Sequence, residues 1–512
     1  MKVILKSCIF ILTLYFNLLS QYNYFSGYFS GTNPNEPLKL VLTKEVVSPG
    51  SKVIRIRFSN DTYLGQNSYL KIRSKNSNSI YQIINSKTLQ DWYYTSAFFN
   101  GDRVYIDFYV AYGDINVCFG IIRLLDGVGC GYIPSHSNIC GGIDTRQPAS
   151  SCNVGRILPG GGTAFYTDKG VFVTAGHIFT HPILIGDFPP IVEFNVPMSD
   201  EFGCLQVSEP KDQYPIDTSS IDYEYNDNST EITVDWAIFD INGDCHPKDF
   251  CNQTPLTPIQ YDPSVIQTVR VTGYGIDYPL NNQIPQDEYT LNQVCQTSVG
   301  SFLGETNYII KHRSNTEMNS SGSPIVINSS TNGIRGLIGI HTRGGCNDQG
   351  HYGNYGTSFN YPTLFNRVTN PLTVVNISQL DANNNQLIGS TIGLWRNNRF
   401  ENYTIINDEP LRVKLPKDRI NTFRADYNIL SNQKFYVWVT SKSEKSFLIF
   451  DTFYVTRKFS INSYFNYAID NIKILNNLIV FLILLKIKVG SFINSIPHID
   501  FQNFNYTIYQ SI

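Results

Sequence analysis

The chain has few charged residues and no strong excess of either sign. Asp, Glu, Lys and Arg make up 16% of its 512 residues, and the formal net charge at pH 7 is −3. Proteins that bind nucleic acid need a basic surface to contact phosphates, so this composition argues against a nucleic-acid partner. Aromatic residues reach 13% and β-branched residues are abundant, which favours strands. No long helical periodicity occurs in the first 370 residues, so an all-β fold is expected.

The chain also lacks an apolar run long enough to cross a bilayer. The best candidate is residues 474–485, which Asn476 and Asn477 interrupt and lysines flank. About twenty consecutive apolar residues are needed to span the hydrocarbon core. We therefore expect no membrane anchor.

The N-terminus has the pattern of a secretory signal peptide at residues 1–20. Lys2 and Lys6 provide the positive start, and Cys8 to Leu19 provides an apolar core too short for a membrane span. Secretion is the expected localisation. Glycosylation sequons suit a secreted glycoprotein. They begin at Asn60, Asn228, Asn252, Asn319, Asn328, Asn376, Asn402 and Asn505.

No Cys-x-x-Cys motif is present, so a zinc or redox site is not indicated, and no metal or organic cofactor is expected. Nine cysteines remain once Cys8 leaves with the signal peptide. Cysteines of exported proteins mostly pair, and an odd number leaves at least one thiol or an intermolecular bond. The short-range candidates for disulfides are Cys130–Cys140 and Cys245–Cys251.

Six segments follow from the pattern of strands, turns and loops. Short strands separated by turn signals predict a β-rich, sandwich-like domain at residues 21–125 and another at 371–470. Between them we expect a connector rich in Cys, Gly and Pro and then a domain that carries the motifs described below. The segments are the signal peptide 1–20, the N-terminal domain 21–125, the connector 126–154, the motif-bearing domain 155–370, the C-terminal domain 371–470 and an unassigned tail 471–512.

The stretch with the clearest chemistry is Asn319-Ser320-Ser321-Gly322-Ser323-Pro324, followed by the apolar Ile325-Val326-Ile327. A glycine permits a tight turn beside a substrate. The turn would project the Ser321 hydroxyl as a nucleophile, and backbone N–H groups around it would hold an oxyanion.

A serine nucleophile needs a general base and a group that orients the base. His177 ends the apolar segment Val173-Thr174-Ala175-Gly176-His177. Asp235 begins the apolar segment Asp235-Trp236-Ala237-Ile238-Phe239. Asp222 and Asp240 are the local rivals, and Asp235 is preferred because an apolar strand follows it directly. The predicted catalytic residues are therefore His177, Asp235 and Ser321.

These motifs, in this order, resemble the chymotrypsin-like serine proteases over roughly residues 150–370. Gly339-Ile340-His341-Thr342 and Val271-Thr272-Gly273-Tyr274 are similar to segments of one branch, the glutamyl endopeptidases. The resemblance implies a double β-barrel and a secreted endopeptidase that acts on protein or peptide substrates. It assigns the oxyanion hole to the backbone N–H groups of Asn319 and Ser321. Asn319 departs from the usual glycine, but asparagine tolerates positive φ.

The resemblance also implies how the substrate is selected. In the glutamyl endopeptidases a histidine at the position of His341 and a threonine at that of Thr316 bind the carboxylate of a substrate Glu. Both side chains are hydrogen-bond donors. Position 315 is Asn rather than an acid, so preference for Lys or Arg is not indicated. We therefore expect cleavage after Glu, with Asp as the alternative.

Activation is a further point of departure. Ser320 stands where trypsin-type enzymes carry an aspartate that pairs with a new N-terminal amine after cleavage. Without that aspartate, the same switch should not operate. If the chain has a propiece, the N-terminal unit is the candidate, and a cut is expected in the connector near residues 130–155.

Two other functions remain open from the sequence. The first is a catalytically inactive protease-like domain within a secreted binding or adhesion glycoprotein, a possibility raised by Met318 and Asn319 at usually small positions. The second is an extracellular esterase with the same triad. The chain lacks Gly-x-Ser-x-Gly, and the His-Asp-Ser order is wrong for that fold. The sequence indicates no particular oligomeric state.

Overall fold

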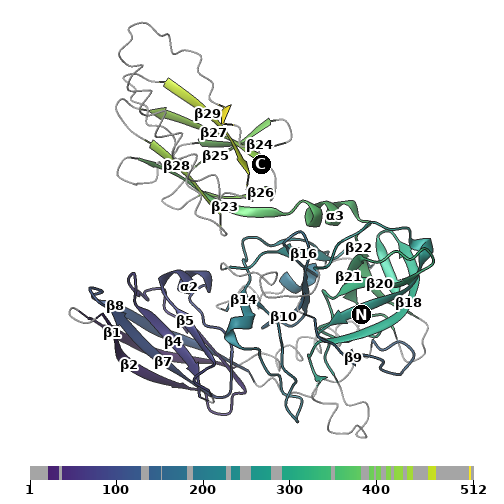
Figure 1. The fold of residues 1–512 in the computed structure, drawn as a ribbon, viewed down its shortest axis with the longest axis horizontal. Helices are drawn as coiled ribbons and strands as arrows, with labels where there is room; N and C mark the ends of the chain where they lie inside the picture. The colour runs from purple at the N-terminus through teal and green to yellow at the C-terminus, as the bar shows by residue number, and fades with distance from the viewer. Residues whose placement is uncertain are drawn as a thin grey trace, which may run out of the picture. The chain divides into compact units, whose positions relative to one another are not determined.

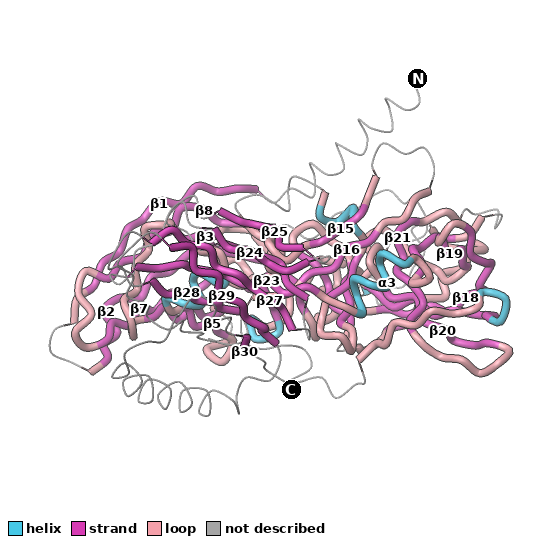
Figure 2. The backbone as a smooth tube through the Cα atoms, turned by 90° about the horizontal axis from the view of Figure 1, so that it is seen from above, coloured by secondary structure: helices cyan, strands magenta, loops and turns pink. Residues whose placement is uncertain are grey.

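Strands predominate among the described residues, and the helices there are short (Figure 1, Figure 2). The chain divides into two compact units between residues 369 and 370. The predicted signal peptide lies outside the described residues. None of the helices in the described part of the chain is long and apolar enough to span a membrane. The computed structural model describes residues 21–33, 37–75, 77–127, 138–151, 153–180, 188–226, 232–242, 255–277, 291–346, 352–381, 391–396, 399–404, 411–416, 420–429, 435–441, 459–468 and 507–508.

The N-terminal region is the expected β-sandwich, with two facing sheets (Figure 1). Where one face of a sheet packs inward, alternate side chains along a strand are buried. β4 (Tyr69–Ser74), for example, buries every second residue. One sheet orders β1 (Gln21–Gly31), β8 (Val117–Gly127), β3 (Val53–Phe58) and β6 (Phe99–Asn100). The other orders β2 (Leu38–Val47), β7 (Arg103–Ala111), β4 and β5 (Tyr81–Ile84), and α2 (Ser86–Asp91) follows β5.

The sandwich and the next part of the chain share one hydrophobic core. Leu158, Phe188 and Ile191 belong to the same buried cluster as the sandwich residues. Arg55 of β3 is fully buried and donates to the carbonyl oxygen of Pro189 at 2.8 Å. Burial lowers the pKa of Arg55 to about 9. The sandwich and these residues of the next part of the chain therefore pack as one continuous core.

The first half of residues 155–370 is a curled sheet, or half-barrel. Nearly all its central strand residues are buried, and Phe172, Phe194 and Phe239 pack their rings within it. The sheet orders β14 (Gln213–Pro215), β13 (Ile191–Glu193), β10 (Val154–Leu158), β11 (Thr163–Tyr166), β12 (Phe172–Thr174), β16 (Trp236–Phe239) and β15 (Asp222–Glu224). Short 3-10 turns lie at Gly176–Phe179 (η1) and Pro210–Asp212 (η3).

The second half is a closed barrel, because β17 pairs with both β20 and β18. Its core is aliphatic and centres on Val269, Ile325 and Ile338. The sheet orders β17 (Ile266–Gly273), β20 (Pro324–Ser330), β21 (Leu337–Arg343), β22 (Asn354–Ser358), β19 (Ile309–His312), β18 (Gln296–Thr306) and β9 (Gln147–Pro148). η5 (Pro263–Val265) precedes β17, and α3 (Pro362–Thr369) follows β22. The half-barrel and the barrel together give the chymotrypsin-like double barrel that the sequence predicts.

The unit after residue 369 contains only strands among its described residues. One antiparallel sheet orders β26 (Leu411–Pro416), β23 (Leu372–Asp381) and β28 (Phe435–Ser441). The other orders β25 (Arg399–Thr404), β24 (Thr391–Arg396), β27 (Ile420–Ile429), β29 (Phe459–Ala468) and β30 (Thr507–Ile508). This agrees with the β-rich domain that the sequence predicts at residues 371–470.

Candidate active site

Strand pairing brings His177 and Asp235 together. β12 and β16 are antiparallel neighbours, with Thr174 opposite Ala237. The end of β12 therefore lies beside the start of β16. Residues that follow β12 and residues that precede β16 meet at this edge of the sheet. Asp235 lies at this edge immediately before β16, and His177 lies in the short turn η1.

Two hydrogen bonds join His177 to the Asp235 carboxylate, one from its ring and one from its backbone. His177 Nδ1 lies 2.6 Å from Asp235 Oδ2, and the backbone N–H of His177 donates to Asp235 Oδ1 at 3.0 Å. Thr357 Oγ1 in turn donates to the Asp235 carbonyl oxygen at 2.9 Å. The carboxylate is almost completely buried, while 30% of the His177 side chain is exposed. The imidazole is thus fixed on one side and accessible on the other.

The rival acids lie in other contacts. Asp222 pairs with Arg367 at 3.2 Å. Asp240 accepts the backbone N–H of Ile241 at 2.9 Å. In the described part of the chain, Asp235 is the acid that pairs with His177.

Residues 316–321, here named the nucleophile loop, enter β20 through a turn that requires glycine. Gly322 has φ +89°, and a Cβ at this position would lie 1.9 Å from the Thr163 carbonyl oxygen. The Ser321 carbonyl oxygen accepts the Thr163 N–H at 2.8 Å. Thr174, three residues before His177, donates from Oγ1 to the Thr163 carbonyl oxygen at 2.6 Å. The loop therefore contacts the same hairpin, β11–β12, that leads to His177.

Ser321 is partly buried, and its Oγ donates to the carbonyl oxygen of Thr342 at 3.4 Å. Asn319 has φ +70°, so asparagine adopts here the left-handed conformation expected of it. Among the described residues, the N–H groups of Asn319 and Ser321 have no protein acceptor, whereas that of Gly322 donates to His341. These two backbone donors of the loop are thus free for a ligand.

His341 and Thr316 are both buried in the second barrel. His341 Nδ1 and Thr316 Oγ1 have no hydrogen-bond partner among the described residues. Burial lowers the pKa of His341 well below its usual range, and the charges of His312 and His177 add to this effect. His312 packs edge-on against His341, with ring centroids 5.5 Å apart, and burial lowers its pKa to about 3. His312 was not expected at this site, because no local motif in the sequence marks it.

The connector is built into the second barrel. β9 pairs with β18, and the Cys140 N–H donates to Asn315 Oδ1 at 2.9 Å. Cys140 forms a disulfide with Cys346, so the suggested short-range bond Cys130–Cys140 is wrong. The two cysteines are 206 residues apart in the sequence, so the folded chain rather than local sequence brings them together. The other suggested bond, Cys245–Cys251, lies outside the described residues.

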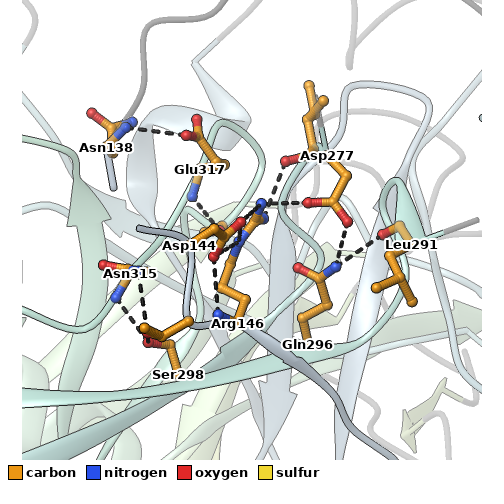
Figure 3. A network of polar contacts seen from close by, with 12 residues as sticks. Asn138, Asp144, Arg146, Asp277, Leu291, Gln296, Ser298, Asn315 and Glu317 are labelled. Atoms are coloured by element: carbon orange, nitrogen blue, oxygen red, sulfur yellow. Dashed lines mark hydrogen bonds and ion pairs between the residues drawn. The ribbon is translucent and has the colours of Figure 1, made fainter. Parts of the chain in front are cut away.

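Glu317 is a buried acid that no sequence motif marks. It is 4% exposed, and its Oε1 accepts the Asn138 N–H at 3.2 Å (Figure 3). Burial raises its pKa to about 7, with Asp144 also raising it and Arg146 opposing the rise. A carboxyl in this environment is protonated over much of the acidic range.

Glu317 makes stability depend on pH. The pKa of Glu317 in the folded chain is above its ordinary value of 4.5. Its stabilisation of the fold is therefore complete below pH 4.5 and is lost as pH rises through about 7. Glu317→Gln should remove this pH dependence of the unfolding free energy, which amounts to about 3 kcal/mol between pH 4.5 and about 7. Urea unfolding of both chains at pH 5 and pH 8 checks this. Equal pH slopes in the two chains would contradict the prediction.

No group of three His, Cys, Asp or Glu side chains within the described ranges is arranged to hold a metal ion. The candidate site offers a hydroxyl from Ser321, an imidazole from His177 and a carboxylate from Asp235. This combination serves nucleophilic acyl transfer.

Comparison with known families agrees with this geometry. The sequence model of the trypsin family matches residues 139–364. None of the curated proteins matches the chain. The matched segment contains both halves of the double barrel, His177, Asp235 and Ser321. Residues 139–364 are therefore a domain of the trypsin family, the chymotrypsin-like serine proteases.

Proposed function

We propose that the protein is a secreted serine endopeptidase that uses His177, Asp235 and Ser321 as a catalytic triad and cleaves after Glu. The observation that carries the proposal is the 2.6 Å contact between His177 Nδ1 and buried Asp235. It is accompanied by Ser321, which directly precedes a turn that requires glycine at position 322. Secretion rests on the signal-peptide pattern at residues 1–20 and the disulfide between Cys140 and Cys346.

In this proposal Asp235 fixes the tautomer of His177. A carboxylate only accepts hydrogen bonds, so His177 Nδ1 carries the ring proton and donates a hydrogen bond to Asp235. Nε2 then keeps its lone pair and accepts the Ser321 proton as the oxygen attacks the scissile carbonyl carbon. The Ser321 bond to Thr342 is long at 3.4 Å, so the hydroxyl gives up little when it turns to His177. The protonated imidazole later delivers this proton to the leaving amine.

The oxyanion that forms would be held by the N–H groups of Asn319 and Ser321. Both donors are free of protein acceptors in the described structure, and the positive φ of Asn319 orients its peptide within the turn. Donors fixed before the reaction stabilise the developing charge without reorganisation, and each is worth about 3 kcal/mol in comparable enzymes. Asn319 thus serves in place of the usual glycine.

Preference for Glu, as in the glutamyl endopeptidase branch, is supported by the polar groups of His341 and Thr316. A buried donor without a partner is costly unless a ligand satisfies it. His341 is neutral when free because burial lowers its pKa. A neutral imidazole still has one N–H donor, and the Thr316 hydroxyl is a second donor for a substrate carboxylate.

Thr316→Val tests the pocket with little change in side-chain shape. Loss of one hydrogen bond to a charged group should lower kcat/KM for a Glu substrate about 10- to 100-fold, while an Ala substrate is little affected. Thr268→Val is a matched control, because Thr268 Oγ1 bonds Ser329 in another part of the barrel. Equal losses for both substrates, or none, would contradict the assignment.

The function itself is tested by a panel of peptides that vary only in the residue before the scissile bond. Cleavage after Glu supports the proposal. Cleavage after a different residue keeps the peptidase and contradicts the pocket. No cleavage by the correctly folded chain would favour an inactive protease-like domain in a secreted binding protein.

A further inference from the structure

A buried cation lies beneath the nucleophile loop. The Arg146 side chain is 5% exposed, and its Nη2 lies 2.6 Å from Asp144 Oδ2 (Figure 3). Arg146 also pairs with Asp277, whose second oxygen accepts Gln296 Nε2 at 2.6 Å. Burial alone would lower the pKa of Arg146, but its bonds to Asp144 and the nearby carboxylate charges raise it overall. The guanidinium is therefore charged and held by two carboxylates.

Two hydrogen bonds connect this guanidinium to the nucleophile loop. Arg146 Nη1 donates to the carbonyl oxygen of Ile276 at 3.1 Å. The N–H of the same residue, Ile276, donates to the carbonyl oxygen of Met318 at 2.8 Å. Met318 directly precedes Asn319, one of the two proposed oxyanion donors. Displacement of Ile276 would therefore move the peptide that enters the oxyanion hole.

The guanidinium also approaches the loop directly beside Gly275. A Cβ at Gly275 would lie 2.8 Å from Arg146 Nη1 and 2.6 Å from Ser320 Oγ. Ser320 Oγ accepts the Glu317 N–H at 3.1 Å, so it closes a tight turn within the loop. Arg146, Ser320 and Thr316 line the same small cavity. Ser320 carries no charge, and Asp144 and Asp277 supply the carboxylates that hold the cation.

We propose that Arg146 is a positioning residue that holds the nucleophile loop in its working conformation in the uncleaved chain. The cation comes from a side chain within the connector, two residues after its ion-pair partner Asp144. No new chain terminus is needed to supply it. The proposal has two parts. The effect of Arg146 on catalysis, the kinetic part, rests on the proposed peptidase function. The effect of Arg146 on the conformation of the loop, the structural part, does not.

Arg146→Ala in the full chain, with intact mass verified, tests the kinetic part. Loss of the support should lower kcat/KM by about 100-fold, as expected for a misplaced catalytic group. Guanidinium chloride at a concentration too low to unfold the protein should restore part of kcat, because the cation fits the vacated space. Tetramethylammonium chloride at the same ionic strength should not. Arg73→Met is the matched control: it removes another arginine–carboxylate pair, with Asp107, in the sandwich.

Hydrogen exchange tests the structural part independently of activity. In Arg146→Ala, the N–H groups of Ile276 and Ser320 should exchange faster, because their bonds to Met318 and Glu317 depend on the support. Protection in the sandwich strands should stay unchanged. If wild type cleaves no peptide, the proposed function fails, yet faster exchange at these two positions would still support the positioning role.

The result that overturns the proposal is wild-type activity and wild-type exchange in Arg146→Ala. If that variant does not fold, Arg146→Lys decides, since it keeps the charge and loses the planar fork. A kcat about tenfold lower with unchanged KM and unchanged melting temperature supports positioning, since this is the loss of about one hydrogen bond. A wild-type kcat in Arg146→Lys overturns the proposal. So does a lower kcat that is fully explained by a lower melting temperature.

Discussion

Replacement of Ser321 by alanine is expected to lower kcat for peptide hydrolysis by about 10⁶-fold, leaving only what binding and oxyanion stabilisation provide. An alanine side chain has no oxygen to attack the carbonyl carbon. The neighbouring hydroxyls of Ser320 and Ser323 are buried and bonded within the turn, so neither can replace it. The fold should be retained, because the Ser321 hydroxyl makes only a long contact with Thr342 in the described structure. Steady-state hydrolysis of a Glu-containing peptide measures the effect.

Ser301→Ala is the matched control for this substitution. Ser301 is an exposed serine on β18 of the same barrel and should be replaceable without effect. Activity that survives in Ser321→Ala within tenfold of wild type would show that another residue is the nucleophile.

Asp235→Asn is expected to lower kcat by about 10⁴-fold with little change in fold. The reason lies in the two bonds that Asp235 makes. Oδ1 accepts the backbone N–H of His177, and Oδ2 faces Nδ1. An asparagine has a single oxygen, so the backbone N–H retains it and the amide NH₂ faces Nδ1. Nδ1 must then accept a hydrogen bond, the proton moves to Nε2, and His177 loses the lone pair that takes the Ser321 proton.

Asp240→Asn provides the control. Asp240 directly follows the same strand, β16, but its side chain accepts the backbone N–H of Ile241. Comparable losses in Asp235→Asn and Asp240→Asn would indicate a general effect on the strand. A loss confined to Asp235→Asn would support the tautomer argument. Near wild-type kcat in Asp235→Asn would contradict it.

The double barrel was predictable because its signals are local. Short apolar segments separated by glycine turns predict strands, and the order of the motifs resembles one family. The proximity of His177 and Asp235 was also within reach, since each lies at the end of an apolar strand. The left-handed conformation of Asn319 followed from the known tolerance of asparagine for positive φ.

The buried charges could not be predicted in the same way. Arg146 and Asp277 are 131 residues apart, and nothing near either one indicates that barrel closure will bury them together. The disulfide between Cys140 and Cys346 was missed for the same reason, because a preference for nearby partners favours Cys130. Likewise the shared core of the sandwich and the half-barrel depends on residues such as Arg55 and Pro189, whose contact spans 134 positions. Local sequence patterns indicate which residues are buried. They give little information about which buried residues contact each other across long sequence separations.

Covalent labelling is the most direct test of the proposed triad. The intact chain would be treated at neutral pH with a fluorophosphonate, which reacts with activated serine hydroxyls, and the adduct located by peptide mass mapping. The account predicts one adduct, on the peptide that contains Ser321, and its absence in Asp235→Asn over the same time. An adduct on a different serine, or none on the folded chain, would contradict it.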